Sequence, residues 1–201
     1  MKKIIFALGI SLFLSQGAPL FAQDPDTHLK NARSAFASGD LEGARFALQE
    51  AMNALDLAIG EELMKLLPDK MGDLGFDASQ DQLGVGNMGF AGLHLSRQYG
   101  NAEKTSVTVS VIADSPLLAG INAVLALPFM GGDSGQKRIR LGGFRGLLQR
   151  SEDGNGDISW DMQIPFGSSL LTLAFKGIPD EHSVMAMAQS IPLDQMARLL
   201  Q

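Results

Sequence analysis

Five cations stand close together in the C-terminal half of the sequence, with no acidic residue among them: Lys137, Arg138, Arg140, Arg145 and Arg150. Guanidinium and ammonium groups gathered on one strand can hold an anion, because each donates charged hydrogen bonds to phosphate or carboxylate oxygens. We therefore regard Lys137, Arg138, Arg140 and Arg145 as candidates for binding an acidic partner or an anionic lipid. The alternative is structural, since the acids of residues 152–161 would face these cations across a hairpin.

A short acidic segment just after this run is the second candidate. Its oxygen-bearing side chains occupy every second position: Asp153, Asn155 and Asp157. With Gly156 at the sharp turn, this segment resembles the middle of a calcium-binding EF-hand loop. The carboxylate that closes such a loop would fall on Met162, which cannot ligate calcium. We expect no resident metal, keep these three residues only as a calcium candidate, and interpret the segment as a β-hairpin turn, for which Asn-Gly is typical.

Two glycine-rich motifs resemble sites of cofactor binding or catalysis. Residues 84–89 have the spacing of a dinucleotide-binding loop, but that site requires a helix next, and the sequence predicts a strand there. Residues 132–135 match the core of the chymotrypsin-type serine protease motif without the histidine segment of that family. We expect no cofactor and no enzyme activity. A less favoured hypothesis is a hydrolase with an active site around Ser134, His94 and Asp114.

The composition limits the function further. The chain has 201 residues, no cysteine, and 22 acidic against 16 basic residues, so it forms no disulfides and lacks the positive charge of a general nucleic-acid binder. Lys2 and Lys3 precede an apolar stretch over residues 4–14 and then a segment of polar and small residues that ends at Ala22, the arrangement of a secretory signal peptide. We expect export, cleavage after Ala22, a periplasmic location, and no transmembrane helix in the mature chain.

Residues 23–68 predict a helical hairpin. The first helix is expected to end near Gly39, and Asp40 caps the second helix, which Pro68 ends. Apolar residues three or four positions apart form one face of the second helix: Leu41, Ala44, Leu48, Ala51, Leu55, Ile59, Leu63 and Leu66. Residues 39–52 resemble part of a single tetratricopeptide repeat, which implies either a peptide-binding module or a hairpin packed on the next domain.

The remainder predicts a glycine-rich loop or linker over residues 69–92 and then an antiparallel sheet. Strict alternation of apolar and polar residues indicates six strands, at 93–99, 105–113, 137–142, 144–150, 157–164 and 169–176. Helices are expected over 116–127 and 180–190, both covering the apolar face of the sheet, and over 193–200. The fold class is therefore α+β. The order of elements in residues 93–200 resembles the PsbP-like α/β/α sandwich, a fold that many exported adaptor proteins use.

These features divide the chain into a signal peptide (1–22), a helical hairpin (23–68), a glycine-rich loop (69–92) and an α+β domain (93–201). The leading hypothesis is an exported, non-catalytic protein that binds or supports another component of the cell envelope. The alternative is a small-ligand or lipid-binding module with residues 69–92 as a lid. A partner-binding protein should expose an apolar patch on the hairpin, whereas a ligand carrier should enclose a cavity.

Overall fold

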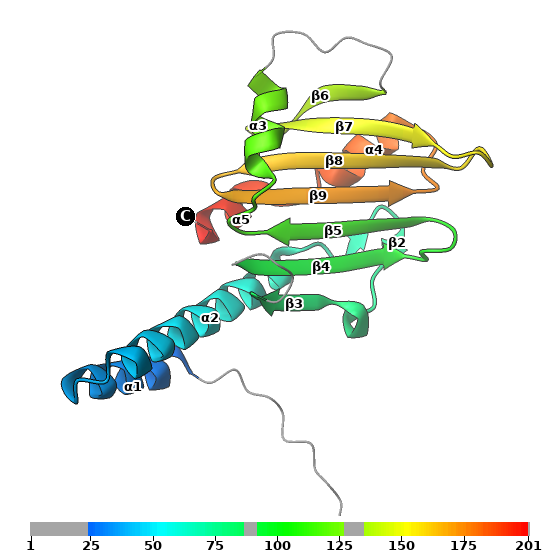
Figure 1. The fold of residues 1–201 in the computed structure, drawn as a ribbon. Coiled ribbons are helices and arrows are strands. Elements are labelled where there is room, and N and C mark those ends of the chain that lie inside the picture. Colours follow the sequence, from blue (N-terminus) through cyan, green and yellow to red (C-terminus); the bar gives the residue numbers. More distant parts are fainter. Residues whose placement is uncertain (1–23, 87–91, 127–134, 201) are drawn as a thin grey trace, which may run out of the picture.

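A computed structural model describes residues 24–86, 92–126 and 135–200. It confirms the α+β class, with an N-terminal helical hairpin followed by a seven-stranded antiparallel sheet and further helices (Figure 1). No helix formed by these residues is long and apolar enough to cross a membrane.

The hairpin consists of α1 (Pro25–Ala37) and α2 (Leu41–Leu66). Both predicted cap features are confirmed, because Gly39 adopts a φ of +82° and Oδ1 of Asp40 accepts a hydrogen bond from the Gly43 N–H at 2.9 Å. Small buried side chains let the two helices approach closely: Ala32, Ala44, Ala47, Ala51 and Ala54. Only the C-terminal part of α2 lies on the sheet, and the rest of the hairpin projects beyond it (Figure 1).

Residues 69–86, expected to belong to a loop or linker, contain short regular elements. Strands β1 (Lys70–Met71) and β2 (Leu74–Gly75) form a small hairpin, and the 3-10 helix η1 (Ala78–Gln80) follows. Strand β3 (Gln82–Val85) then pairs antiparallel with β4 and forms one edge of the main sheet. Alternation of apolar and polar residues could not reveal these strands, because two to four residues are too few to show a period of two.

A buried ion pair holds this segment against the sheet. Arg97 is only 7% exposed, and its Nη2 lies 2.6 Å from Oδ2 of Asp81, which precedes β3. The same guanidinium donates a hydrogen bond to the Met64 carbonyl of α2 at 3.3 Å and stacks 3.8 Å from the centroid of the Phe76 ring. Burial lowers the pKa of Arg97, but the hydrogen bonds and the negative charge of Asp81 raise it by more than burial lowers it. The pKa of Arg97 therefore lies above its ordinary value. One side chain thus joins α2, the η1 segment and the sheet.

The main sheet has the strand order β3-β4-β5-β9-β8-β7-β6, and every neighbouring pair is antiparallel. The six strands expected from alternation are all present within a residue or two of their predicted bounds: β4 (Leu93–Gly100), β5 (Ser106–Ile112), β6 (Gln136–Leu141), β7 (Phe144–Glu152), β8 (Ile158–Phe166) and β9 (Ser169–Lys176).

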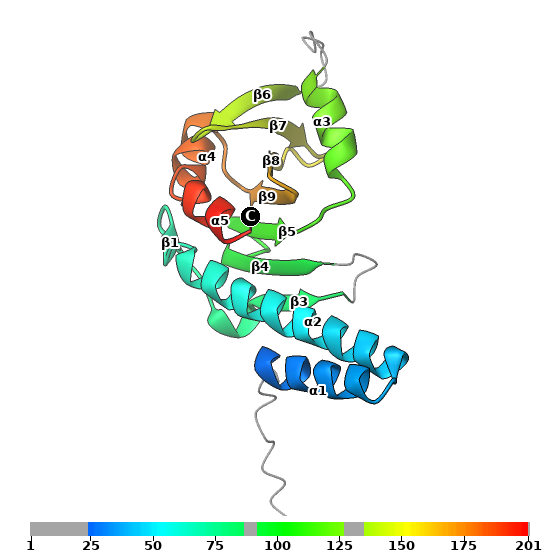
Figure 2. The ribbon, with the colours of Figure 1, turned by 90° about the vertical axis from the view of Figure 1, so that its left-hand side faces the viewer.

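The two faces of the sheet carry different helices, which corrects one expectation. The large core lies on the face shared by α2, α4 (Glu181–Ala188) and α5 (Leu193–Leu199), whose buried residues join the strand residues there. Helix α3 (Leu118–Ala126) lies on the opposite side, as Figure 2 shows, where Ile121 packs with Leu147 and Leu170 in a separate small cluster. Residues 116–127 therefore do not cover the same face as residues 180–190. Leu147 and Leu170 give this second face a local apolar patch that alternation alone does not reveal.

Candidate functional site

The hairpin carries the most exposed apolar surface of the described residues. Nine large hydrophobic side chains are exposed among the described residues, and seven of them belong to α1 and α2. Six lie in two helical rows, which we name the hairpin face: Leu29, Phe36, Leu41, Leu48, Met52 and Leu55. Their exposed fractions run from 50% at Leu48 to 69% at Phe36. The predicted single apolar face of α2 is thus divided, because its alanines pack on α1 while its leucines near the N-terminal end face solvent.

Helix geometry places the two rows on the same side of the hairpin. Leu29 of α1 and Leu48 of α2 each precede a buried alanine by three residues, so each row is rotated equally from the contact between the helices. Since the helices are antiparallel, equal rotations point to one side. Phe46, the seventh exposed side chain, lies two positions before Leu48 and therefore on the far side of α2.

Two cations interrupt this apolar surface. Arg33 follows Leu29 by four residues, and Arg45 follows Leu41 by four, so each continues its row. Both side chains are exposed, and no ion pair within the described residues includes either of them. The hairpin face therefore combines leucine-rich rows with two positive charges.

The basic residues at the other end of the sheet fall on two faces. Lys137 forms an ion pair with Glu181 of α4, on the side of the main core. Arg138, Arg140 and Arg145 alternate onto the side of α3, and Arg140 stands directly opposite Arg145 in the β6–β7 register. The acids of residues 152–161 do not compensate Arg145, since its cross-strand partner is itself an arginine. Arg150 lies opposite Trp160 and pairs with Glu152 of its own strand at 2.8 Å.

The three arginines on the α3 side line an open pocket of about 300 Å³, which we name the arginine pocket: Leu125, Arg138, Ile139, Arg140 and Arg145. Nη2 of Arg138 donates a hydrogen bond to the Val124 carbonyl near the end of α3 at 3.1 Å. A second open pocket of about 360 Å³ adjoins it, sharing Leu125 and Arg145 and adding Asn122, Ala126, Pro165 and Gly167. None of the described residues that line these two pockets is acidic.

The calcium-like segment forms the turn between β7 and β8. Oδ1 of Asp153 accepts hydrogen bonds from the backbone N–H groups of Asn155 and Asp157 at 2.8 and 2.9 Å, and Gly156 has a φ of +85°. These backbone donors lower the pKa of Asp153 below its ordinary value. The hairpin interpretation is thus confirmed. The described residues contain no group of three or more histidine or acidic side chains that could hold a metal ion.

The other motifs gain no supporting geometry. Gly84 lies within strand β3 and not at the start of a helix, and residues 87–89 of the same pattern lie outside the described residues. Ser134 also lies outside them, so the structure does not place it relative to His94 or Asp114. His94 sits on β4 opposite Ile112 of β5, on the face away from the main core, as its alternation with leucines predicts.

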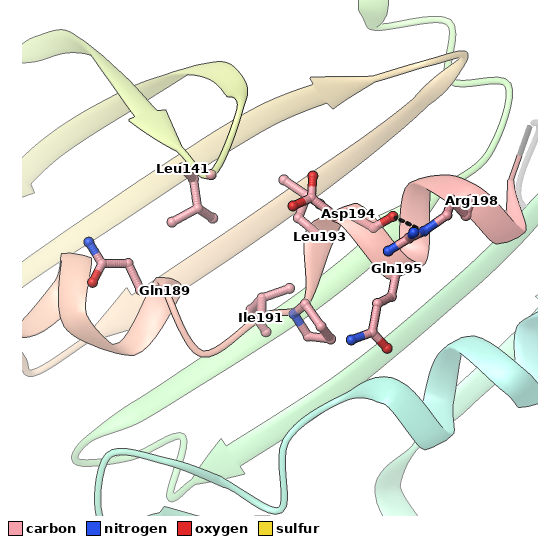
Figure 3. A pocket seen from close by; sticks show the side chains of 9 residues that line it. Leu141, Gln189, Ile191, Leu193, Asp194, Gln195 and Arg198 are labelled. Carbon is pink, nitrogen blue, oxygen red and sulfur yellow. Dashed lines mark hydrogen bonds between the residues drawn. The ribbon is translucent and has the colours of Figure 1, made fainter.

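A further open pocket of about 460 Å³ lies where α4 and α5 meet the β6–β7 turn (Figure 3). Leu141, Ile191 and Leu193 supply its apolar part. Gln189, Gln195 and Arg198 supply polar groups, and Nε of Arg198 donates a hydrogen bond to the Asp194 carbonyl at 3.2 Å. No residue of the segment 69–86 lines this pocket or the two beside α3.

Sequence reasoning found the arginines but missed the exposed rows of the hairpin and the buried Arg97. The signal for the first was present, because alanines and leucines alternate at heptad spacing in α2, and small residues mark the closer helix contact. Arg97 gave only a weak signal, namely a cation at an inward position between Leu95 and Tyr99.

The fold and these surfaces define an α+β protein with a projecting, apolar helical hairpin. Comparison with protein-family models, curated proteins and solved structures finds no match for the chain. The resemblances to a tetratricopeptide repeat and to the PsbP-like sandwich stay interpretations of local pattern and element order.

Proposed function

We propose that this protein is an exported, non-catalytic protein that binds a partner protein of the cell envelope through the hairpin face. The observation that carries the proposal is the exposure of six large apolar side chains on one side of α1 and α2. Soluble proteins rarely leave an apolar patch of this kind uncovered, and such patches mark interaction surfaces. A contact that covers these side chains would remove them from water.

The spacing and charge of the hairpin face indicate the chemistry of the partner. Leu41, Leu48, Met52 and Leu55 follow the 3–4 spacing by which helices pack along a seam. Arg33 and Arg45 within the rows would be left with buried, uncompensated charge unless the partner supplies carboxylates. We therefore expect the partner to present an amphipathic helix with apolar residues at heptad spacing and acidic residues beside them.

The test compares glutamate substitutions and photo-crosslinkers on opposite sides of α2. Leu48→Glu with Met52→Glu places charge in the hairpin face, and Phe46→Glu places it at an equally exposed position on the far side. All three side chains are at least 50% exposed, so the free energy of unfolding should change little. A crosslinker at Leu48 should capture an envelope protein that one at Phe46 does not, and the double variant should abolish capture.

Two results would overturn the proposal. One is equal capture by the Leu48 and Phe46 crosslinkers, which would mean that the rows do not define the contact. The other is a concentration-dependent dimer in sedimentation analysis that the double variant abolishes, because the hairpin face would then be covered by a second copy of this chain.

Export is tested separately. If the signal-peptide interpretation holds, the full gene expressed in its own cells yields a protein in the envelope fraction whose N-terminal residue is Gln23. Mass spectrometry of the intact protein measures this directly. A chain that keeps Met1 and stays with the cytoplasmic fraction would contradict it.

A further inference from the structure

We propose that the arginine pocket and the pocket beside it bind the phosphoryl group of a phosphate ester. This inference does not depend on the hairpin face, which lies with α1 and α2 at the opposite end of the molecule (Figure 1).

The first argument is the placement of Arg140 and Arg145. They are directly opposite one another in the antiparallel β6–β7 pair, where like charges repel and destabilise the pairing. Both are exposed, and within the described residues neither guanidinium forms an ion pair that compensates its charge. A bound dianion would convert this repulsion into two sets of charged hydrogen bonds.

The second argument is the position of Arg138. Its hydrogen bond to the Val124 carbonyl holds the guanidinium at the end of α3, on the same side of β6 as Arg140. Arg138 therefore lines the arginine pocket already oriented, and it loses less side-chain entropy on meeting an anion than a free arginine would. Three arginines thus line one pocket of about 300 Å³.

The third argument is the character of the two linings. The chain as a whole has a net charge of −6, yet every charged residue among the described residues that line these two pockets is an arginine. The other described pockets differ, because the one at α5 contains Asp194 beside Arg198, and the one at the β7–β8 turn contains three aspartates. The positive charge is thus concentrated at α3, β6 and β7.

These linings favour a phosphoryl group as the anion. A tetrahedral phosphate offers several oxygens to the planar forks of more than one arginine, and its negative charge offsets the charges of Arg140 and Arg145. The adjoining pocket continues from Arg145 to Ala126 and Pro165, with Asn122 at its side. The arginine pocket at one end and the less polar adjoining pocket at the other suit a phosphate ester. Its phosphoryl group would contact the arginines, and the esterified group would lie over α3 and the β8–β9 turn.

The experiment uses the full chain after export and two probes. Calorimetry with inorganic phosphate measures the phosphoryl interaction alone. Co-sedimentation with vesicles of phosphatidylglycerol, compared with vesicles of phosphatidylcholine, tests whether a lipid headgroup is the source. The variant Arg140→Gln with Arg145→Gln should weaken binding of the effective probe by about tenfold for each arginine removed.

The matched control also removes two positive charges. Lys137→Gln with Arg150→Gln alters residues that pair with Glu181 and Glu152 and that do not line either pocket. The control should bind within about twofold of the unmodified protein, since long-range charge is largely screened at physiological salt. Melting curves verify that both variants fold.

Each outcome decides the question. Binding to phosphate and to phosphatidylglycerol vesicles, lost in the arginine variant only, assigns the site to a lipid phosphate. Binding to phosphate without vesicle binding, lost in the same way, assigns it to a soluble phosphate ester. Equal losses in both double variants, or no binding of either probe, would overturn the proposal.

Discussion

Replacing Asp81 by asparagine tests whether the buried ion pair holds the η1–β3 segment on the sheet. The carboxylate of Asp81 accepts from two N–H groups of Arg97: the Nε–H is shared between its two oxygens, at 3.0 and 3.1 Å, and Nη2 donates to Oδ2 at 2.6 Å. The side chains are 8% and 15% exposed for Arg97 and Asp81, so water cannot take over these contacts. Asp81→Asn keeps the shape of the side chain but leaves the Arg97 charge without an opposite charge.

The expected loss in the free energy of unfolding is about 3 kcal/mol, at the lower end of the cost of breaking a buried ion pair, because the asparagine carbonyl can still accept one hydrogen bond. The stacking of Arg97 on Phe76 and its bond to Met64 remain. The second change Arg97→Met removes the stranded charge and leaves an apolar side chain of similar length. The double variant should therefore be more stable than Asp81→Asn alone.

Urea unfolding followed by fluorescence is a suitable assay, because Trp160 is the single tryptophan of the chain and lies in the main core. Glu152→Gln is the matched control, since it breaks the Arg150–Glu152 pair, whose side chains are 39% and 50% exposed. That exposed pair should contribute only about 0.5 kcal/mol. The reasoning is refuted if Asp81→Asn costs no more than Glu152→Gln, or if adding Arg97→Met lowers the stability further.

Burial raises the pKa of Tyr99 to about 12, so absorbance at 295 nm should titrate near pH 12 in the native protein and near pH 10 in urea. The difference between the two pKa values contributes to the free energy of unfolding; this contribution is fully present below pH 10 and is lost as the pH rises toward 12. A midpoint near 10 with native circular dichroism would contradict it. Asp180 caps α4 and its pKa is lowered by hydrogen bonds, so Asp180→Ala should lower the urea midpoint at neutral pH, with the difference vanishing as acid protonates the carboxyl group. A Cβ at Gly146 would meet the Gln163 carbonyl at 2.7 Å, so Gly146→Ala should cost about 1–3 kcal/mol, whereas Gly143→Ala, with nothing within 4 Å, should cost almost none.

The strands could be predicted because their signal is local. Alternation of apolar and polar residues, as in Val107, Val109 and Val111, requires only that one face be buried. The hairpin was equally predictable, since Gly39 and Asp40 are turn and cap residues whose preferences come from the backbone itself. These features therefore needed no knowledge of which elements meet in space.

Other features depend on contacts between distant segments. The sequence places Arg97 and Asp81 in different elements, and only the fold brings a loop acid against an inward strand cation. The side on which α3 lies depends likewise on where Leu147 and Leu170 fall relative to the remaining strands. For the arginines, the sequence predicted the cluster, but the alternation of β6 separates Lys137 from the other three. A site shared by several strands thus follows from register more than from spacing.

The two proposed surfaces lie at opposite ends of the molecule (Figure 1), and this arrangement leads to a further prediction. Strand β3 lies beside α2, and β6, which carries the arginine pocket, is six strand spacings away, roughly 29 Å measured along the curved sheet. Charges so far apart are screened at physiological salt, and no side chain belongs to both surfaces. The Leu48→Glu, Met52→Glu pair should therefore leave phosphate binding unchanged, and the Arg140→Gln, Arg145→Gln pair should leave partner capture unchanged. If either pair altered both partner capture and phosphate binding by more than about twofold, the two surfaces would be coupled through the sheet and would not act independently.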